Sequence, residues 1–398
     1  GLLSPPQRMS SYDFEIPVTF RHRIRFTTDA FAPENPVVAD LLGGTDRPVK
    51  VLVYVETEIV RLFPDLREQI AAYLAPLELV TLTEIVEMPG GEECKISKTQ
   101  IMEGIKPIER NGIDRHSYAF CIGGGAFLDV IGLAAATAHR GVRLVRFPTT
   151  TLSQDDSGVG VKNGINGFGK KNFIGTFAVP YAVVNDFRYL GSQPEAACRN
   201  GLVEAVKVAL VKDRTFFEWL EEEVGGLRRL DRPVLESAVE RSAVLHATHI
   251  AQGGDPFETG NSRPLDFGHW SAHKLEQLTD FALSHAEAVS VGAALDCLYS
   301  ARRGWLSEAD CERVLRLLEG LQLPLWDASM DLRDATGRRM VFLGLEEFRE
   351  HLGGELTVLM LRGIGTGFDV HELDEVLLDD CLVELKARAL PGGPEQHS

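Results

Sequence analysis

Three histidines, His269, His273 and His285, lie within seventeen residues of one another in a chain that contains only eleven. His269 and His273 are four residues apart, so on a helix both imidazoles lie on one face, one turn apart. Neutral imidazole is a common ligand of zinc. The spacing fits a metal site, but it also fits a polar helix that happens to carry two histidines. A metal site would need a carboxylate ligand from elsewhere in the chain, and an enzyme would also need a cofactor and a substrate.

Glu204 is the candidate carboxylate. It lies in the segment from Leu202 to Leu210, which is otherwise apolar apart from Lys207. Glu204 and Lys207 are three residues apart and share a helix face, which is most often the sign of a surface ion pair. However, a helix that is apolar on all sides is expected to be buried. A buried glutamate needs a partner, and a metal shared with His269 and His285 would provide one.

Gly123, Gly124 and Gly125 separate a predicted strand from a predicted helix. Glycines at such a junction let the backbone approach a pyrophosphate, and the helix N-terminus offers unpaired N–H groups to it. The spacing is not GxGxxG, so the residues alone leave a nucleotide site and a plain tight turn as open alternatives. Asp129, on the first turns of that helix, is expected either to cap the helix or to face the ligand.

Residues 148–172 contain few large apolar side chains, although they lie between a predicted core strand and the apolar run 173–177. Long loops without regular structure are uncommon in compact domains and are usually functional. We therefore interpret this segment as a polar ligand site and not as a plain exposed loop. Its candidates are donors for a phosphate (Lys162, Lys171 and Asn172) and acceptors for sugar hydroxyls (Asp155 and Asp156).

The elements that would position these residues follow from the apolar periodicity. Alternation over residues 12–26 predicts one or two strands, and the β-branched run 48–55 is typical of a buried parallel strand. Strands and helices then alternate, which predicts a parallel sheet in an α/β, Rossmann-like N-terminal domain over residues 1–193. Helical periodicity dominates after Pro194, so residues 194–398 are predicted to form a mostly α-helical domain.

The composition limits the class of protein. The chain has 398 residues, with 44% hydrophobic and 25% charged residues, which is ordinary for a soluble globular protein. A net charge of −17 argues against nucleic acid as the main partner, and no apolar run is long enough to cross a membrane. The first 30 residues lack the apolar core of a secretory signal. Six scattered cysteines without a CxxC pair predict reduced thiols, so we expect a cytoplasmic protein.

Taken in order, the motifs resemble the 3-dehydroquinate synthase superfamily of sugar-phosphate cyclases, from about Val49 to about Asp369. The motifs are GGEECK (90–95), GGG (123–125) with Asp129, AHRG (138–141), PTT (148–150), DSGVGVK (156–162), GKKN (169–172), GLVEAVK (201–207), RPLDFGH (263–269) with His273, and HAEA (285–288). So many motifs in one order are not expected by chance. Within the superfamily, the chain is most similar to the branch found in bacterial "ebo" biosynthetic clusters.

The resemblance implies a homodimer with NAD on the Rossmann-like domain, zinc (or cobalt) on the helical domain, and a sugar-phosphate substrate in the cleft between them. Zinc would be held by Glu204, His269 and His285. NAD would lie on Gly123, Gly124 and Gly125, surrounded by Glu92, Lys95, Asp129, Thr149 and Thr150. The substrate phosphate would meet Lys162, Asn172, His273 and, from the neighbouring subunit, Arg140. The ring and its hydroxyls would face Asp156, Lys171 and Lys207. The resemblance therefore moves His273 from the metal to the phosphate.

The chemistry implied by the resemblance is a carbon–oxygen lyase reaction on a heptulose 7-phosphate. NAD oxidises a ring alcohol while zinc polarises the oxygen, phosphate then leaves, and NADH returns the hydride. The ring opens and an intramolecular aldol addition closes a carbocycle. The catalytic side chains implied by the matching positions are Lys207, Asp156, Lys162 and Lys171.

The chain departs from the family pattern on the substrate side. His246 stands where a carboxylate-binding lysine is expected, Asp266 replaces an asparagine, and Arg263 is one residue closer to His269 than usual. A C-terminal lysine is also missing, with Arg349 or His351 near its place. We therefore expect the same type of reaction on the 3-dehydroquinate precursor or on sedoheptulose 7-phosphate, although cyclases of the latter usually lack the histidine present here as His273. A metal-dependent polyol dehydrogenase and a non-catalytic binding protein are the remaining alternatives.

Overall fold

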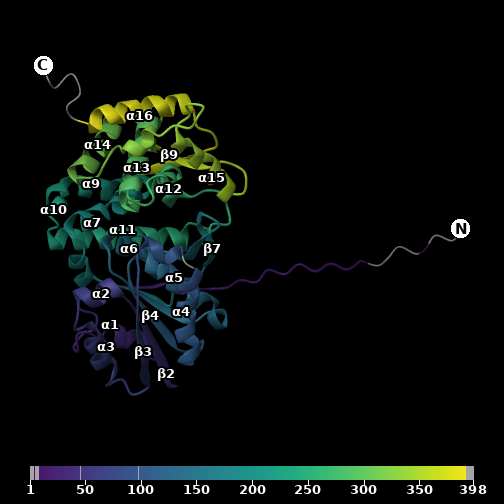
Figure 1. The fold of residues 1–398 in the computed structure, drawn as a ribbon, viewed down its shortest axis with the longest axis vertical. Helices are drawn as coiled ribbons and strands as arrows, with labels where there is room; N and C mark the ends of the chain where they lie inside the picture. Colours follow the sequence, from purple (N-terminus) through teal and green to yellow (C-terminus); the bar gives the residue numbers. More distant parts are fainter. Residues whose placement is uncertain (1–3, 5–8, 45, 97, 391–398) are drawn as a thin grey trace.

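The computed structural model describes residues 4, 9–44, 46–96 and 98–390, and Figure 1 shows an α/β half joined to a helical half. Six parallel strands form the sheet of the α/β half, in the order β1-β8-β5-β4-β2-β3. They are β1 (Arg23–Thr27), β2 (Val49–Glu56), β3 (Val80–Met88), β4 (Tyr118–Gly123), β5 (Arg143–Pro148) and β8 (Ala182–Asp186). The predicted parallel, Rossmann-like sheet is confirmed.

Both faces of this sheet are buried, which explains why its central strands are apolar throughout. Side chains alternate along a strand. In β2, accordingly, Val51, Val53 and Val55 enter one core cluster, while Leu52 and Tyr54 enter another. The first cluster includes residues of α1 (Val37–Leu42), α2 (Thr57–Leu62) and α3 (Leu66–Leu74), and the second includes residues of α4 (Lys98–Arg110) and α5 (Gly125–Thr137).

Residues 148–172 are not a plain exposed loop, because most of them form regular structure. They contain α6 (Thr151–Asp155), the 3-10 helix η3 (Ser157–Val159) and most of an antiparallel hairpin of β6 (Lys162–Gly167) and β7 (Lys170–Phe177). Small residues are used because the hairpin lies very close to its neighbours. A Cβ on Gly132 of α5 would lie 1.9 Å from Asn163 Oδ1, and one on Gly175 would lie 2.4 Å from the Asn163 carbonyl oxygen. Polar composition here reflects tight packing, not a loop.

The predicted helical half is confirmed. Its helices are α7 (Glu195–Asn200), α8 (Val203–Lys212), α9 (Arg214–Glu222), α10 (Val224–Arg228), α11 (Arg232–Gln252), α12 (His269–Leu278), α13 (His285–Arg302), α14 (Glu308–Gly320), α15 (Leu343–His351) and α16 (Glu375–Ala389), with a small hairpin of β9 (Val358–Gly363) and β10 (Thr366–Val370). Helix α13 is buried from Ala286 to Ala301 except at Glu287, so it forms the centre of this half. Within the described residues, no helix is both long and apolar enough to span a bilayer.

The strand prediction for residues 12–26 is only partly correct. The structure has β1 from Arg23, but the residues before it form neither helix nor strand, and we call residues 9–22 the N-terminal arm. Figure 1 shows this arm leaving the body of the molecule as an extended segment. The alternating pattern is that of a strand, but the chain itself places no neighbouring strand beside it.

Candidate active site between the sheet and the helices

Three helix beginnings bring together the candidate metal ligands. Glu204 lies in the first turn of α8, while His269 and His285 are the first residues of α12 and α13. Their ligand atoms lie within 4.8 Å of one another. Glu204 is fully buried; Lys207 forms an ion pair with its carboxylate, and His285 Nε2 lies 3.6 Å from its Oε1. A buried carboxylate in this state fits a divalent metal, which would satisfy both oxygens.

Two local features fix the spacing of the histidines. Gly268, which precedes α12, has φ of 78°, and a Cβ on it would lie 2.8 Å from the Ala293 amide nitrogen. On the facing helix, a Cβ on Gly292 would lie 2.1 Å from the Gly268 carbonyl oxygen. The beginning of α12 therefore rests directly on α13. Ser284 caps α13 through a capping box, which fixes the helix start at His285.

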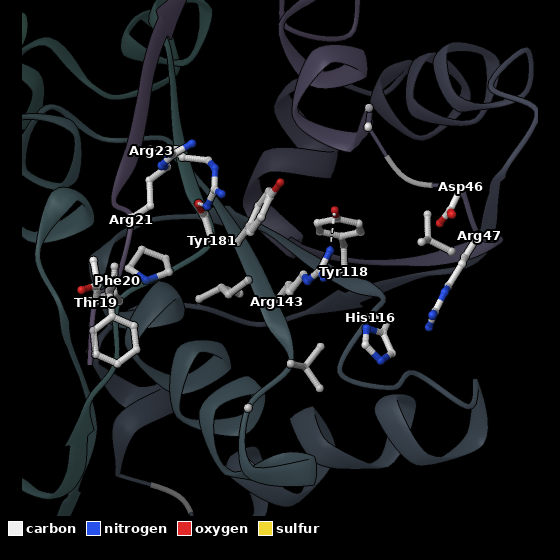
Figure 2. Close-up of a pocket in the computed structure, with 18 residues that line it drawn as sticks. Thr19, Phe20, Arg21, Arg23, Asp46, Arg47, His116, Tyr118, Arg143 and Tyr181 are labelled. Carbon is white, nitrogen blue, oxygen red and sulfur yellow. Dashed lines mark hydrogen bonds between the residues drawn. The ribbon is translucent and has the colours of Figure 1, made fainter. Parts of the chain in front are cut away.

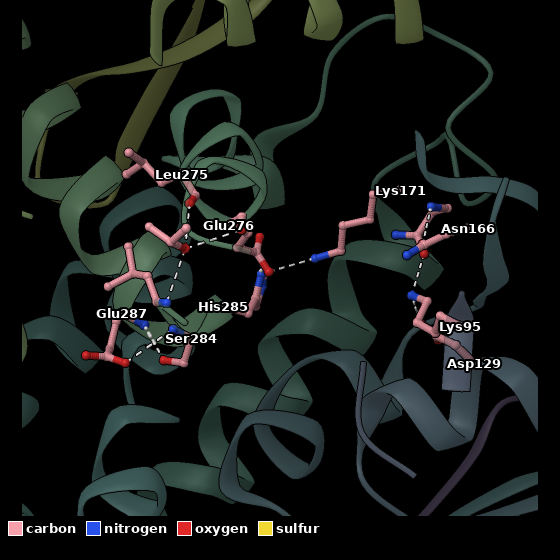
Figure 3. Close-up of polar contacts among 12 residues, drawn as sticks. Lys95, Asp129, Asn166, Lys171, Leu275, Glu276, Ser284, His285 and Glu287 are labelled. Atoms are coloured by element: carbon pink, nitrogen blue, oxygen red, sulfur yellow. Dashed lines mark hydrogen bonds and ion pairs between the residues drawn. The ribbon is translucent and has the colours of Figure 1, made fainter. Parts of the chain in front are cut away.

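The ring nitrogens of both histidines have partners that orient them. His269 Nδ1 lies 3.1 Å from the Phe267 carbonyl oxygen, and His285 Nδ1 lies 3.1 Å from Glu276 Oε2. Each contact fixes the tautomer and leaves Nε2 to face a metal, as is usual for metal-binding histidines. Burial opposes ionisation of His285, but Glu276 outweighs it and raises the pKa of the imidazole to about 9, so a metal that binds Nε2 would displace a proton from it. Figure 3 shows Glu276 between His285 and Lys171. The Nζ of Lys171 lies 2.9 Å from Glu276 Oε1.

His273 lies beside this group. Its ring centroid is 5.4 Å from that of His269 and 6.1 Å from that of His285. A second possible metal group consists of His273, Glu276 and His285. We favour the first group, because Glu276 binds Lys171 and the Nδ1 of His285, whereas Glu204 lies 3.6 Å from the Nε2 of that ring. Burial, followed by the nearby Lys171, lowers the pKa of His273 well below its usual value, so the ring is neutral at pH 7.

Asp156 connects the metal group to the rest of the site. Its Oδ1 lies 3.4 Å from Lys207 Nζ and 2.9 Å from His246 Nδ1. The structure thus brings His246 to the site, as its sequence position suggested. Burial alone would raise the pKa of Asp156, but Lys207 and His246 outweigh it and hold the carboxyl ionised.

The expectation that Asp155 meets a sugar hydroxyl stays a prediction. Its side chain is fully buried, and burial raises the pKa of this carboxyl well above its ordinary value. Asp155 is the last residue of α6 and Asp156 is its C-cap, and Glu204 and Asp156 both lie close enough to Asp155 to raise its pKa further.

The loop between α11 and α12 forms the substrate end of the site. Glu258 Oε1 lies 2.5 Å from Lys162 Nζ, and Glu258 Oε2 lies 3.0 Å from Arg263 Nε. Arg263 also donates to the Glu258 carbonyl oxygen at 2.9 Å. Burial would raise the pKa of Asp266, but Lys162 above all lowers it, so this carboxyl is ionised as well. Glu258 was not among the predicted site residues, because no motif marks it.

The glycine junction lies at the carboxyl end of β4. Gly123 ends the strand, Gly124 is the N-cap of α5 and Gly125 is its first residue. The Thr149 amide donates to the Gly123 carbonyl at 3.0 Å, and Thr150 caps α6 through a capping box. A Cβ on Gly124 would lie 3.4 Å from Thr150 Cγ2, and a Cβ on Gly125 would lie 3.0 Å from Ser157 Oγ. Because side chains have so little room here, this surface is bare backbone, which suits the binding of a pyrophosphate.

Glu56 was missed by the sequence analysis. It ends β2, and the Gly124 amide donates to its Oε1 at 3.4 Å. An acidic residue at this point is the usual partner of a ribose hydroxyl in dinucleotide-binding folds. The signal was available, because Glu56 directly follows the predicted strand 48–55.

The remaining cofactor candidates lie beside the glycine junction. Glu92 has one buried carboxylate oxygen without a hydrogen bond from the described residues, and Lys95 is 2% exposed. Lys95 Nζ lies 2.8 Å from Asp129 Oδ2 and also bonds Asn172. Lys171 and Asn172 are consecutive residues of β7 but have different partners: Lys171 bonds Glu276, as Figure 3 shows, and Asn172 bonds Lys95.

Three predicted residues lie elsewhere in this chain. Arg140 is exposed at the amino end of β5, with φ of 62°, whereas Thr149 follows the carboxyl end of the same strand. Its assignment to the site of a neighbouring subunit stays a prediction. Arg349 and His351 are exposed at the end of α15, and the contacts among the described residues do not connect them to the site.

Comparisons with known proteins agree with this geometry. Residues 85–200 match the N-terminal model of 3-dehydroquinate synthase and residues 201–340 match its C-terminal model. The 3-dehydroquinate synthase of Azotobacter vinelandii is 38% identical over 306 residues, which cover 75% of this chain and 80% of that protein.

Two solved structures share the fold. The 2-epi-5-epi-valiolone synthase of Streptomyces hygroscopicus subsp. jinggangensis, solved with NAD+ and Zn2+, has a TM-score of 0.82 at 27% identity, over 95% of this chain and 100% of that one. A 2-deoxy-scyllo-inosose synthase, solved with carbaglucose-6-phosphate, NAD+ and Co2+, has a TM-score of 0.73 at 20% identity, over 91% and 96%. The chain therefore belongs to the 3-dehydroquinate synthase family of sugar-phosphate cyclases.

Proposed function

We propose that this protein is an NAD- and zinc-dependent cyclase that converts a heptulose 7-phosphate to a carbocycle with loss of phosphate. The observation that carries the proposal is the fully buried Glu204, which offers a ligand oxygen within 4.8 Å of the ligand nitrogens of His269 and His285. When bound, NAD would accept and return a hydride, and zinc (or cobalt) at Glu204, His269 and His285 would polarise the reacting oxygen.

The side chains divide into three groups by place. Lys207 and Asp156 would hold the ring hydroxyls next to the metal; they form an ion pair with each other, and Asp156 also contacts His246. Lys162, Asn172 and His273 would bind the phosphate, and Lys171 would orient Glu276 while facing the ring. Glu92, Lys95, Asp129, Thr149 and Thr150 would surround NAD on the glycine junction. These groups hold the substrate in one orientation, which is the main contribution of the protein to such chemistry.

Sedoheptulose 7-phosphate is the substrate that the electrostatics favour. The precursor of 3-dehydroquinate carries a carboxylate, which needs an available cation. Here the Arg263 guanidinium is already bound by Glu258, and the ionised Asp266 lies close to Lys162. Two carboxylates at this end would repel a third but would accept hydrogen bonds from hydroxyls. The 27% identical valiolone synthase supports the same choice.

The second candidate is the 3-dehydroquinate precursor, 3-deoxy-arabino-heptulosonate 7-phosphate, which is supported by the 38% identity to a 3-dehydroquinate synthase and by the presence of His273. We also propose a homodimer in which Arg140 completes the phosphate site of the other subunit, and a division of the chain into domains at residues 193 and 194.

A substrate panel tests the proposal. The protein would be loaded with NAD and zinc and offered sedoheptulose 7-phosphate, 3-deoxy-arabino-heptulosonate 7-phosphate and glycerol, with phosphate release and the carbocycle followed by NMR. We expect phosphate and a valiolone-type product from sedoheptulose 7-phosphate. Phosphate from the carboxylate substrate alone would favour the second candidate. NADH accumulation on glycerol would indicate a polyol dehydrogenase, and no turnover of any substrate would contradict the cyclase proposal.

A further inference from the structure

The N-terminal arm carries one apolar face that the chain covers only at its root, where the ring centroid of Phe20 lies 5.9 Å from that of Phe257. Tyr12, Phe14, Ile16, Val18 and Phe20 alternate with polar residues and Pro17, and residues two apart share a face in an extended segment. Their exposed fractions run from 83% at Phe14 to 56% at Phe20. Five large apolar side chains on one face of an extended arm are a surface that water disfavours, so this face is expected to have a partner.

A basic groove lies where the arm joins the body. Figure 2 shows this cavity of about 870 Å³, which lies at the amino ends of β2, β4 and β5. Arg21, Arg23 and Arg143 contribute positive charge; Arg23 lies 4.1 Å from the ring centre of Tyr181 and Arg143 lies 5.3 Å from that of Tyr118. Such a cluster is unusual in a chain with a net charge of −17.

The groove is separate from the candidate active site. The glycine junction lies at the carboxyl ends of the strands, where α/β sheets bind their ligands, whereas the groove lies at the opposite ends. Its apolar lining includes Val142, Leu144, Val179 and Pro180, and Thr19 and Phe20 at the root of the arm line it as well.

We propose that this groove accepts the N-terminal arm of a second copy of the chain, so that two subunits exchange arms around a twofold axis. Both faces of the arm complement the groove in chemical character. The acidic residues of the arm, Asp13 and Glu15, complement the groove arginines, and the apolar face complements the apolar lining. Because the root of each arm lines its own groove, the arm of the other copy would lie next to that root, which is the reciprocal contact that twofold symmetry requires.

The arm is better suited to another copy than to its own groove. Residues 9–22 form no turn, and Figure 1 shows them running away from the body of their own chain. Extended, the twelve residues 9–20 span roughly 40 Å at about 3.3 Å per residue, which is ample to cross a subunit boundary.

The first experiment measures the oligomeric state of the full chain by analytical ultracentrifugation. We expect a dimer whose dissociation constant rises by roughly 10- to 100-fold in Ile16→Glu, because each arm loses one buried side chain. The matched control is Val376→Glu, which places the same charge on a residue that is 75% exposed on α16 and should leave the dimer unchanged. An equal dissociation constant in both variants would overturn the proposal.

The second experiment tests exchange itself. A chain carrying Ile16→Cys would be mixed with a longer, tagged chain carrying Val179→Cys and oxidised mildly; the six native cysteines are buried. We expect a disulfide between the short and the long chain. Exclusive intramolecular cross-linking in a chain carrying both cysteines would show that the arm folds back, and would overturn exchange. A dimer that survives removal of residues 1–18 unchanged would overturn the arm proposal while leaving the homodimer proposal intact.

Discussion

The two ends of the candidate site are built in different ways. At the metal end, Glu204, His269 and His285 stand on the first turns of three helices, two of which touch backbone to backbone at Gly268 and Gly292. At the substrate end, Glu258 and Arg263 lie in a loop, and their positions depend on ion pairs with each other and with Lys162.

This difference explains where the chain keeps the family pattern and where it departs from it. Ligands on helix starts cannot move without moving a helix, so the metal end matches the family motifs throughout. A loop tolerates changed side chains, so the substrate end can carry Asp266 and Glu258 without disturbing the metal. If this view is correct, changes at the metal end should affect metal binding and changes at the substrate end should affect substrate choice.

The largest effect is expected for Glu204→Gln. The amide keeps the shape of the side chain but removes the only anionic ligand in the group, so metal affinity should fall by more than about 100-fold, beyond the roughly 10- to 100-fold cost of losing an outer partner. Metal content after dialysis, measured by atomic emission, tests this. Glu218→Gln, on an exposed residue of α9, is the control. Full metal content in Glu204→Gln would refute the ligand assignment.

Glu276→Gln should weaken metal binding by roughly 10- to 100-fold, because the carboxylate that orients His285 loses its charge. Competition with a chelator would measure the metal affinity, and NAD affinity should stay unchanged. Glu347→Gln, which removes a surface partner of Lys274, is the matched control. Loss of NAD binding together with the metal would mean that the metal end is less independent than we propose.

Asp266→Asn should change substrate choice without changing metal content. Removing one negative charge next to Lys162 should shift the ratio of kcat/KM values toward the carboxylate substrate by roughly tenfold, the equivalent of about one pKa unit of interaction. Steady-state kinetics on both heptulose phosphates would measure the ratio. Asp380→Asn on the exposed side of α16 should leave it unchanged. A loss of zinc in Asp266→Asn would break the distinction between the two ends.

The smallest effect concerns the core behind the metal end. Trp270, which follows His269, donates to Asp296 Oδ1 at 3.0 Å, and burial raises the pKa of Asp296 to about 8 despite that bond. The folded protein therefore holds a proton that the unfolded chain releases above about pH 4. Stability from this group is complete at lower pH and is lost as pH rises toward 8.

Between pH 6 and 7, the free energy of unfolding should fall by at most about 1.4 kcal/mol because of Asp296. In Asp296→Asn this part of the pH dependence should disappear, as chemical denaturation at the two pH values would reveal. Parallel pH profiles for the two proteins would mean that Asp296 is ionised in the folded state.

The sequence predicted the elements that show a regular apolar pattern. The parallel sheet and the helical half follow from apolar runs and helical periodicity, and the metal group follows from the resemblance. The helix and hairpin within residues 148–172 were not predicted, because close packing, as between Gly132 and Asn163, requires small residues and leaves no apolar alternation. Residues 12–22 were predicted to be part of one or two strands but form none, because an alternating pattern does not specify a partner strand. Glu258 has no local signal at all.

The alternation of side chains along β7 limits where members of the family can gain or lose residues. Lys171 and Asn172 are neighbours, yet one serves the metal side and the other the cofactor side. Because side chains alternate along a strand, a one-residue insertion between the β-turn and Lys171 would interchange the two sides. Insertions and deletions should therefore collect in loops such as the one between α11 and α12, while the spacing from Lys162 to Asn172 stays constant among active members.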